Sequence, residues 1–145
     1  MAREITAEEE ARLWLNYATE YNARAFYNIA NHYGSPAAAR AALAASAEDF
    51  AALPEYFRLK LNEANQPGFI PRMLEQMEKK HIRFTYPGDE RYPKLLTEIP
   101  DPPSVLYYIG QIEPDPELAI AIIGSRHPSK YGIEVAKRFG HELAS

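Results

Sequence analysis

The stretch Leu118-Ala-Ile-Ala-Ile-Ile-Gly-Ser-Arg-His-Pro-Ser-Lys-Tyr-Gly132 decides the fold class of the second part of the chain. The continuous apolar run 118–123 predicts a strand that is buried on both faces, as in a parallel sheet covered by helices. Gly124 ends this strand, and apolar residues recur at helical spacing from about Tyr131 onward. Strand, tight loop and helix in this order are the opening of a Rossmann-like α/β unit.

Two further strands are expected before this unit. Residues 82–86 alternate apolar and polar side chains, and residues 105–109 form a second β-rich run, with a short helical turn around Lys94 between them. The helix after Gly124 is the crossover that leads to a parallel neighbour strand, yet no strand follows before Ser145. We therefore expect residues 83–145 to be the first part of a Rossmann-like α/β domain, incomplete in this chain.

Residues 1–82 have the pattern of an all-α helical domain. Ten of the twelve prolines lie at or beyond Pro67. Thr6 and Glu9 have the spacing of a capping box, and Gly34 is placed to end a helix. Five or six short helices are expected, at about 6–17, 22–33, 35–44, 46–53, 55–65 and 69–80.

Composition excludes several classes of protein. The 145 residues carry a net charge of −4, spread evenly as −2 on residues 1–82 and −2 on residues 83–145, and they include no cysteine. A disulfide scaffold, a cysteine-based zinc site and a thiol nucleophile are therefore excluded. No apolar run approaches the ~20 residues of a membrane span, and the acidic start is not a secretory signal. We expect a cytoplasmic protein whose nucleic-acid contact, if it has one, is a local site.

The loop after the apolar run carries the chemistry for holding a phosphate. Gly124 lets the backbone approach a ligand, and the first N–H groups of the following helix attract an anion. The side chains suited to the same task are Ser125, Arg126 and Ser129, with Lys130 adding charge and Tyr131 able to stack on a base or sugar. The alternative interpretation is structural: the glycines fit a turn, Ser129 caps the helix and Arg126 is an ordinary surface residue.

Other polar residues give weaker indications. The loop matches neither the G-x-G-x-x-G nor the P-loop fingerprint, so we expect no nucleotide cofactor. The four histidines, His32, His81, His127 and His141, lack metal-ligand spacing, so no metal is expected. Asp101 lies between prolines and is expected to form a turn. Residues 8–10 are expected to be favourable charges at a helix N-terminus.

Several linked motifs resemble the DprA/Smf DNA-processing protein family. They are Tyr92-Pro-Lys-Leu-Leu96, Ile99-Pro-Asp-Pro-Pro103, Val105-Leu-Tyr107, Gly110, Ala121-Ile-Ile-Gly-Ser-Arg126, Ser129 and Tyr131-Gly132. The helical part is similar to the N-terminal domain that many members carry, of SAM-like or helix-hairpin-helix type.

The resemblance implies a function for the chain and a site for it. Members are cytoplasmic bacterial proteins without known catalytic activity, which bind single-stranded DNA in natural transformation and help to load the RecA recombinase. Their Gly-Ser-Arg loop lies in a positively charged pocket that holds the DNA backbone. Carried over, this role falls on Gly124, Ser125, Arg126 and Ser129, and more loosely on Lys130 and Tyr131. The part of the family's length that is missing here is expected to carry the homo-oligomer interface and the recombinase contact.

Two other functions stay open at this point. Rossmann-like folds with phosphate loops also serve nucleotide enzymes such as the lysine-decarboxylase-like phosphoribohydrolases. Alternatively, the helices of residues 1–82 act as a protein-interaction module. The turn at Gly34 has no second glycine and no adjacent lysine or arginine, which favours protein contact over DNA contact for that turn.

Overall fold

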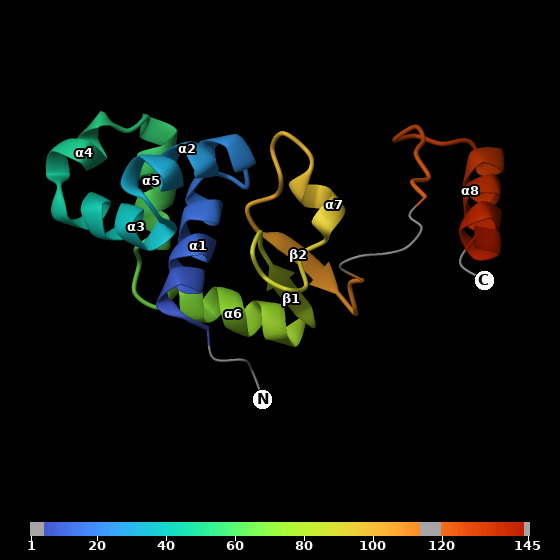
Figure 1. Ribbon diagram of the computed structural model, residues 1–145, viewed down its shortest axis with the longest axis horizontal. Coiled ribbons are helices and arrows are strands. Elements are labelled where there is room, and N and C mark those ends of the chain that lie inside the picture. Colours follow the sequence, from blue (N-terminus) through green and yellow to red (C-terminus); the bar gives the residue numbers. More distant parts are fainter. Residues whose placement is uncertain (1–4, 114–119, 144–145) are drawn as a thin grey trace. The chain divides into compact units, whose positions relative to one another are not determined.

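The computed structural model describes residues 5–113 and 120–143, which belong to two compact units divided after residue 115 (Figure 1). The first unit holds six helices followed by a two-stranded sheet, with a short seventh helix between the two strands. Its elements are α1 (Ala7–Ala18), α2 (Ala23–Tyr33), α3 (Pro36–Ala45), α4 (Ala47–Ala52), α5 (Glu55–Ala64), α6 (Phe69–Lys79), β1 (Ile82–Thr85), α7 (Lys94–Thr97) and β2 (Leu106–Ile109). The second unit holds α8 (Lys130–Leu143).

The helix boundaries follow the capping chemistry of the sequence. Thr6 and Glu9 form the capping box that starts α1, with the Glu9 N–H donating to Thr6 Oγ1 at 3.2 Å and the Thr6 N–H donating to Glu9 Oε2 at 2.8 Å. Gly34 ends α2 with φ +94°, a conformation that glycine adopts without strain. The six helices before the first strand confirm the prediction of five or six.

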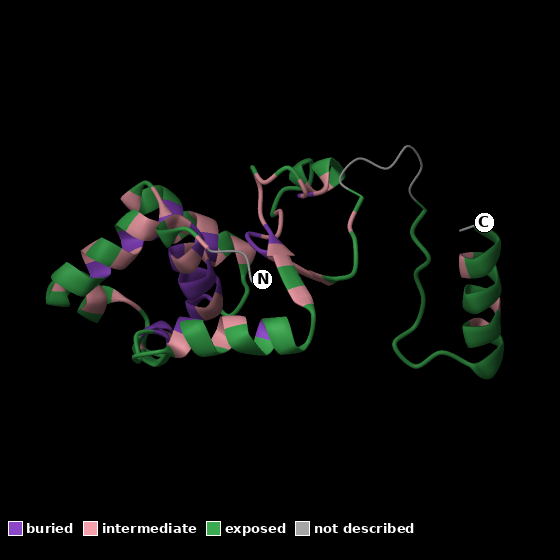
Figure 2. Ribbon diagram, turned by 90° about the horizontal axis from the view of Figure 1, so that it is seen from below, coloured by how far each residue is buried: buried purple, intermediate pink, exposed green. Residues whose placement is uncertain are grey.

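Helix α1 lies at the centre of the first unit and is buried on most of its sides (Figure 2). Leu13, Trp14 and Leu15 are each at most 1% exposed, and they pack with side chains from α2, α3, α5 and α6. The indole Nε1 of Trp14 donates to Asn65 Oδ1 at 2.9 Å, so its buried donor is satisfied. Because residues on three successive positions are buried, α1 is a core helix rather than a surface helix.

The expected strands and the turn between them are confirmed. β1 and β2 pair antiparallel, with Phe84 opposite Tyr107, and this pair packs against the helical core. The short helix α7 includes the predicted turn at Lys94. The boundary proposed between residues 82 and 83 therefore lies within one compact unit, and a division into separate domains there stays a prediction.

A polar seam joins α1 to the segment before β2. Asn16 donates from Nδ2 to Tyr107 Oη at 3.2 Å and accepts at Oδ1 from Ser104 Oγ at 2.9 Å. Arg12 donates to the Ser104 carbonyl at 3.4 Å, and its guanidinium lies 4.5 Å from the centroid of the Tyr86 ring. The seam connects residues some ninety positions apart and holds the hairpin on the helices.

The strand expected over residues 118–123 is not formed over residues 120–123, the part of it that the structure describes. Residues 118 and 119 lie outside the described residues, and residues 120–123 have no regular secondary structure. Ile120, Ile122 and Ile123 are 56%, 47% and 90% exposed. A strand is stabilised by hydrogen bonds to a neighbouring strand, and the described residues of the second unit include none. The amphipathic helix that was expected to follow is confirmed as α8, while the Rossmann-like and SAM-like details stay predictions.

Candidate nucleic-acid interface

The loop that leads into α8 is organised by two serine side chains. Ser125 Oγ accepts a hydrogen bond from the His127 N–H at 3.2 Å. Ser129 Oγ accepts one from the Gly132 N–H at 3.2 Å, and the Ser129 carbonyl accepts from the Ile133 N–H at 3.1 Å. Ser129 is therefore the N-cap of α8, as the structural interpretation of the sequence expected. Its hydroxyl proton is not used in this bond and can be donated to an anion.

The start of α8 presents further donors beside Ser129. Lys130 and Tyr131 occupy the first two positions of the helix, whose N–H groups have no acceptor within the helix. Tyr131 is 75% exposed, and Lys130 is exposed beside it. The helix dipole gives this end a partial positive charge, so the geometry suits a phosphate.

Arg126 is the charged side chain at the centre of the loop. It is exposed, and it makes no hydrogen bond or ion pair with any residue that the structure describes. An unpaired guanidinium keeps its planar fork free for the oxygens of a phosphate. The structure thus leaves five residues exposed within the short stretch 125–131, namely Ser125, Arg126, Ser129, Lys130 and Tyr131.

Gly124 and Gly132 are not required by the backbone of this structure. A Cβ added at Gly124 meets nothing within 4 Å, and the residue does not have the left-handed φ that favours glycine. A Cβ on Gly132 lies 3.6 Å from Ser129 Oγ, an ordinary contact. The close approach of a ligand is the remaining physical reason for Gly124 that the sequence suggested, and it stays a prediction.

The acidic residues that the sequence singled out have structural partners. Glu10 pairs with Arg40 at 2.9 Å, and Glu8 accepts from the N–H of Ala37, near the start of α3, at 3.3 Å. Asp101 pairs with Arg24 at 3.1 Å, which ties the proline-rich connection to α2. Among the residues with described positions, no group of three or more His, Asp or Glu side chains is arranged to hold a metal ion.

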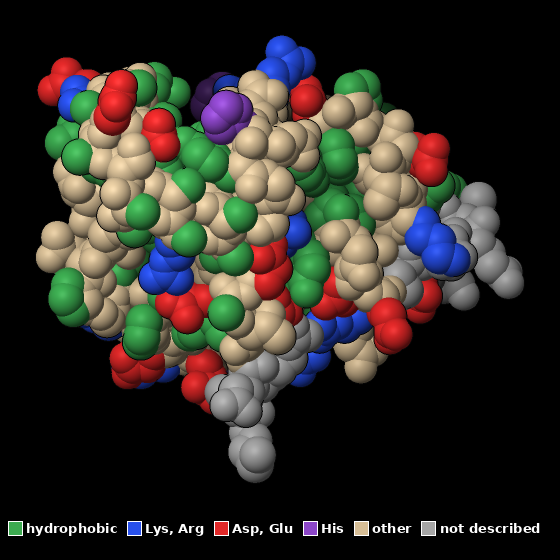
Figure 3. All heavy atoms as spheres, turned by 60° about the vertical axis from the view of Figure 1, so that its left-hand side comes forward, with side chains coloured by type: hydrophobic (Ala, Val, Ile, Leu, Met, Phe, Trp, Pro, Cys, Tyr) green, Lys and Arg blue, Asp and Glu red, His purple; other side chains and the backbone are tan. Residues whose placement is uncertain are grey.

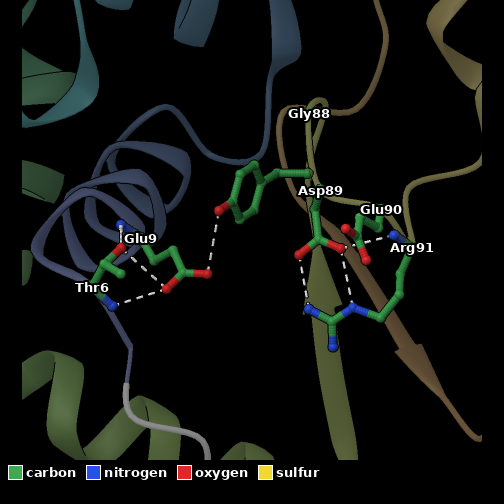
Figure 4. Close-up of a pocket in the computed structure, with 7 residues that line it drawn as sticks. Thr6, Glu9, Gly88, Asp89, Glu90 and Arg91 are labelled. Carbon is green, nitrogen blue, oxygen red and sulfur yellow. Dashed lines mark hydrogen bonds and ion pairs between the residues drawn. The ribbon is translucent and has the colours of Figure 1, made fainter.

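A shallow pocket of about 490 Å³ lies between the start of α1 and the turn after β1 (Figure 4). Two of its carboxylates are engaged: Glu9 accepts from Tyr86 Oη at 3.3 Å as well as from Thr6, and Asp89 accepts from Arg91 through two bonds of 3.0 and 2.8 Å. The hydrogen bond from Arg91 lowers the pKa of Asp89 to about 2, against the opposing effect of burial. The ion pair between Asp89 and Arg91 therefore stabilises the wall of the pocket and does not supply a group suited to acid–base chemistry.

The face of the protein seen in Figure 3 has no broad patch of basic side chains. Figure 3 shows acidic, basic and apolar side chains interspersed on one face, which agrees with the even spread of the −4 net charge along the chain. A DNA contact on such a surface depends on particular side chains and not on a broad field. None of the helices in residues 5–113 and 120–143 is both long enough and apolar enough to span a membrane.

Sequence reasoning did not single out two groups that the structure makes prominent. Arg12 and Asn16 form the seam with Ser104, a contact between segments far apart in the chain, which periodicity does not show. Arg83 is exposed on β1 and has no partner among the described residues, and the sequence pattern around it is that of any outward-facing strand position.

Comparisons with known proteins show what the second part of the chain is similar to. Residues 83–145 match the family model described as DNA recombination-mediator protein A. Protein Smf from Synechocystis sp. is 34% identical over 76 residues, which are 50% of this chain and 19% of that protein. The match thus covers less than a fifth of the relative's length, and no solved structure gives a match. The segment that matches holds the motifs on which the resemblance was based, so the comparisons support the resemblance of residues 83–145 to the DprA/Smf DNA-processing family.

Proposed function

We propose that the protein binds single-stranded DNA in natural transformation and recombination, and that the loop at residues 124–131 contacts the phosphate backbone. The match to a DNA recombination-mediator family supports a role in DNA processing. The observation that carries the finer proposal is the unpaired, exposed Arg126 beside the N-terminus of α8, where Ser129 keeps a hydroxyl proton to donate.

The other parts of the proposal follow the family. The protein acts as a non-enzymatic, cytoplasmic binding protein that protects incoming strands and helps to load RecA, and the homo-oligomer and recombinase contacts lie in the part of the family's length outside this chain. Binding by this chain alone is accordingly weak, because one loop supplies few phosphate contacts.

Titration of a fluorescently labelled oligothymidylate with this chain at low salt, followed by anisotropy, tests the site. Arg126→Ala is expected to weaken binding roughly tenfold, since one charge-assisted hydrogen bond is lost. The slope of log affinity against log salt is expected to fall by about 0.7 for each lost phosphate contact. Lys137→Ala is the matched control, because it removes a positive charge of the same size from an exposed position on α8, away from the loop.

The outcomes separate the candidate functions. Equal affinity of the Arg126→Ala and Lys137→Ala variants removes the loop from the DNA site. Release of free base from a nucleoside monophosphate by the unmodified chain contradicts the non-enzymatic role and favours the phosphoribohydrolase alternative. A pull-down of RecA by the chain on its own contradicts the placement of the recombinase contact outside it.

A further inference from the structure

The exposed arginines of the described residues differ in whether their guanidinium groups have partners. Among the exposed arginines of the described residues, three have partners, namely Arg24 with Asp101, Arg72 with the Pro67 carbonyl and Arg138 with Glu142. Arg83 and Arg126 make no hydrogen bond or ion pair with a described residue. In a chain with more carboxylates than basic groups, a guanidinium left free at the surface is available to an external anion.

Arg83 lies opposite an aromatic side chain. In the register of the hairpin it pairs with Tyr108, so the two side chains are neighbours on one face of the sheet. Arg91 approaches the same ring: its pKa is raised mainly by its hydrogen bond to Asp89, and the Tyr108 hydroxyl adds a smaller hydrogen bond and charge interaction. Tyr108 therefore lies opposite Arg83 in the strand register, and its hydroxyl interacts with Arg91.

The face of the hairpin that carries Arg83 and Tyr108 is only partly open. Successive residues of a strand point to opposite faces, and Phe84 and Tyr107 occupy the face that packs on the helices. Thr85, on the same face as Arg83, is fully buried, so the open part of the face is the end with Arg83 and Tyr108. Lys80 precedes this end, is exposed, and has no partner among the described residues.

We propose that the outer face of the hairpin, formed by Lys80, Arg83, Arg91 and Tyr108, is a second contact for a single strand of DNA. Arg83 and Lys80 bind phosphate oxygens, and a base stacks on the Tyr108 ring, a combination of cations and aromatic ring that suits a flexible strand of any sequence. The ligand class rests on the proposed function, but the residues and the compact unit are different from those of the loop at 124–131. A duplex does not fit this mode, because its bases are already stacked on one another.

Matched variants of the whole chain test the contact. Arg83→Ala is expected to weaken binding of a labelled oligothymidylate at low salt several-fold and to lower the salt slope by about 0.7. Arg72→Ala removes the same charge from α6, where the side chain bonds only to a backbone carbonyl, and is expected to leave both quantities unchanged. Tyr108→Leu keeps an apolar side chain but removes the stacking ring, and is expected to weaken binding about fivefold or more. Circular dichroism of each variant shows that the fold is retained.

Photocrosslinking locates the strand independently of affinity. An oligonucleotide substituted with iodouracil is irradiated with the unmodified chain, and the crosslinked peptides are identified by mass spectrometry. A crosslink at Tyr108 is expected. Equal affinities of Arg83→Ala and Arg72→Ala, or crosslinks that map only outside residues 80–108, overturn the proposal.

The same measurements with Arg126→Ala keep the two proposals apart. If Arg83→Ala weakens binding and Arg126→Ala does not, the hairpin contact stands and the loop site fails. The reverse result removes the hairpin contact alone. A chain that binds no oligonucleotide at low salt overturns both.

Discussion

Asn16 offers the sharpest test of how the hairpin is held on the helices. Its side chain is 2% exposed and makes two hydrogen bonds, one to Tyr107 on β2 and one from Ser104 in the preceding segment. Replacing Asn16 with alanine removes both bonds at once. Ser104 is 2% exposed, and burial raises the pKa of Tyr107 to about 12, so both hydroxyl groups lose their partner in an environment poor in water.

The expected loss of stability follows from those two hydroxyl groups. Each buried polar group left without a partner costs about 1–3 kcal/mol. A water molecule that enters the space left by the amide offsets part of this loss of stability. The higher helix propensity of alanine stabilises α1 by about 0.5 kcal/mol and offsets a further part. We expect Asn16→Ala to lower the free energy of unfolding by about 2–4 kcal/mol, a large share of the stability of an ordinary domain.

Urea denaturation followed by tryptophan fluorescence measures this loss. Trp14 is the single tryptophan, is 1% exposed and lies on α1 two positions from Asn16, so its emission reports unfolding of the core that the seam joins. Asn28→Ala is the control, because it makes the same change at an exposed position of α2 and is expected to alter stability by at most about 0.5 kcal/mol. Equal urea midpoints for the two variants refute the seam as a stabilising contact.

Three further predictions follow from titrating and capping groups. Burial raises the pKa of Tyr107 from 10 to about 12. The contribution of the neutral phenol to stability is therefore complete below pH 10 and is lost as the pH rises toward 12. In thermal melts, the melting temperature of Tyr107→Phe is expected to fall less over this pH range than that of the unmodified chain. The hydrogen bond from Arg91 lowers the pKa of Asp89 from 3.8 to about 2. The contribution of the carboxylate to stability is therefore complete above pH 3.8 and is lost as the pH falls through 2. Asp89→Asn is expected to lower the melting temperature at neutral pH but not near pH 2. Thr6→Ala is expected to cost about 1 kcal/mol in urea denaturation by opening the capping box of α1, whereas a cost under a few tenths contradicts the capping role.

Local chemistry made most of the first unit predictable from the sequence. A cap, a helix end or an alternating strand depends on residues within a few positions, and the capping box, Gly34 and the two strands of the hairpin were found where the sequence indicated them. The seam of Arg12, Asn16 and Ser104 was not predictable, because each contact joins residues about ninety positions apart and no pattern within either segment shows the other.

The apolar run shows why one prediction was wrong. The apolar pattern of residues 118–123 indicates burial on both faces of a strand, but these residues cannot form a strand without a neighbouring strand. Without a hydrogen-bonded neighbour among the described residues, Ile120 to Ile123 adopt no strand. The helix after them was predicted correctly because its hydrogen bonds are internal. At the site, the sequence identified Arg126 and Ser129 through a short motif, whereas the lack of a partner for Arg83 became visible only once the surrounding side chains had positions.

The packing of Phe84 and Tyr107 on the helices limits how the segment before the hairpin can differ between related proteins. The segment that matches the family model begins at residue 83, inside the first compact unit, and it includes β2 and most of β1, whose hairpin has one face covered by the helices in this chain. A relative that dispenses with the helices must cover that face with another structure or carry polar residues at the positions of Phe84 and Tyr107. The residues at these two positions therefore forecast, from a relative's sequence, whether helices of this kind precede its hairpin.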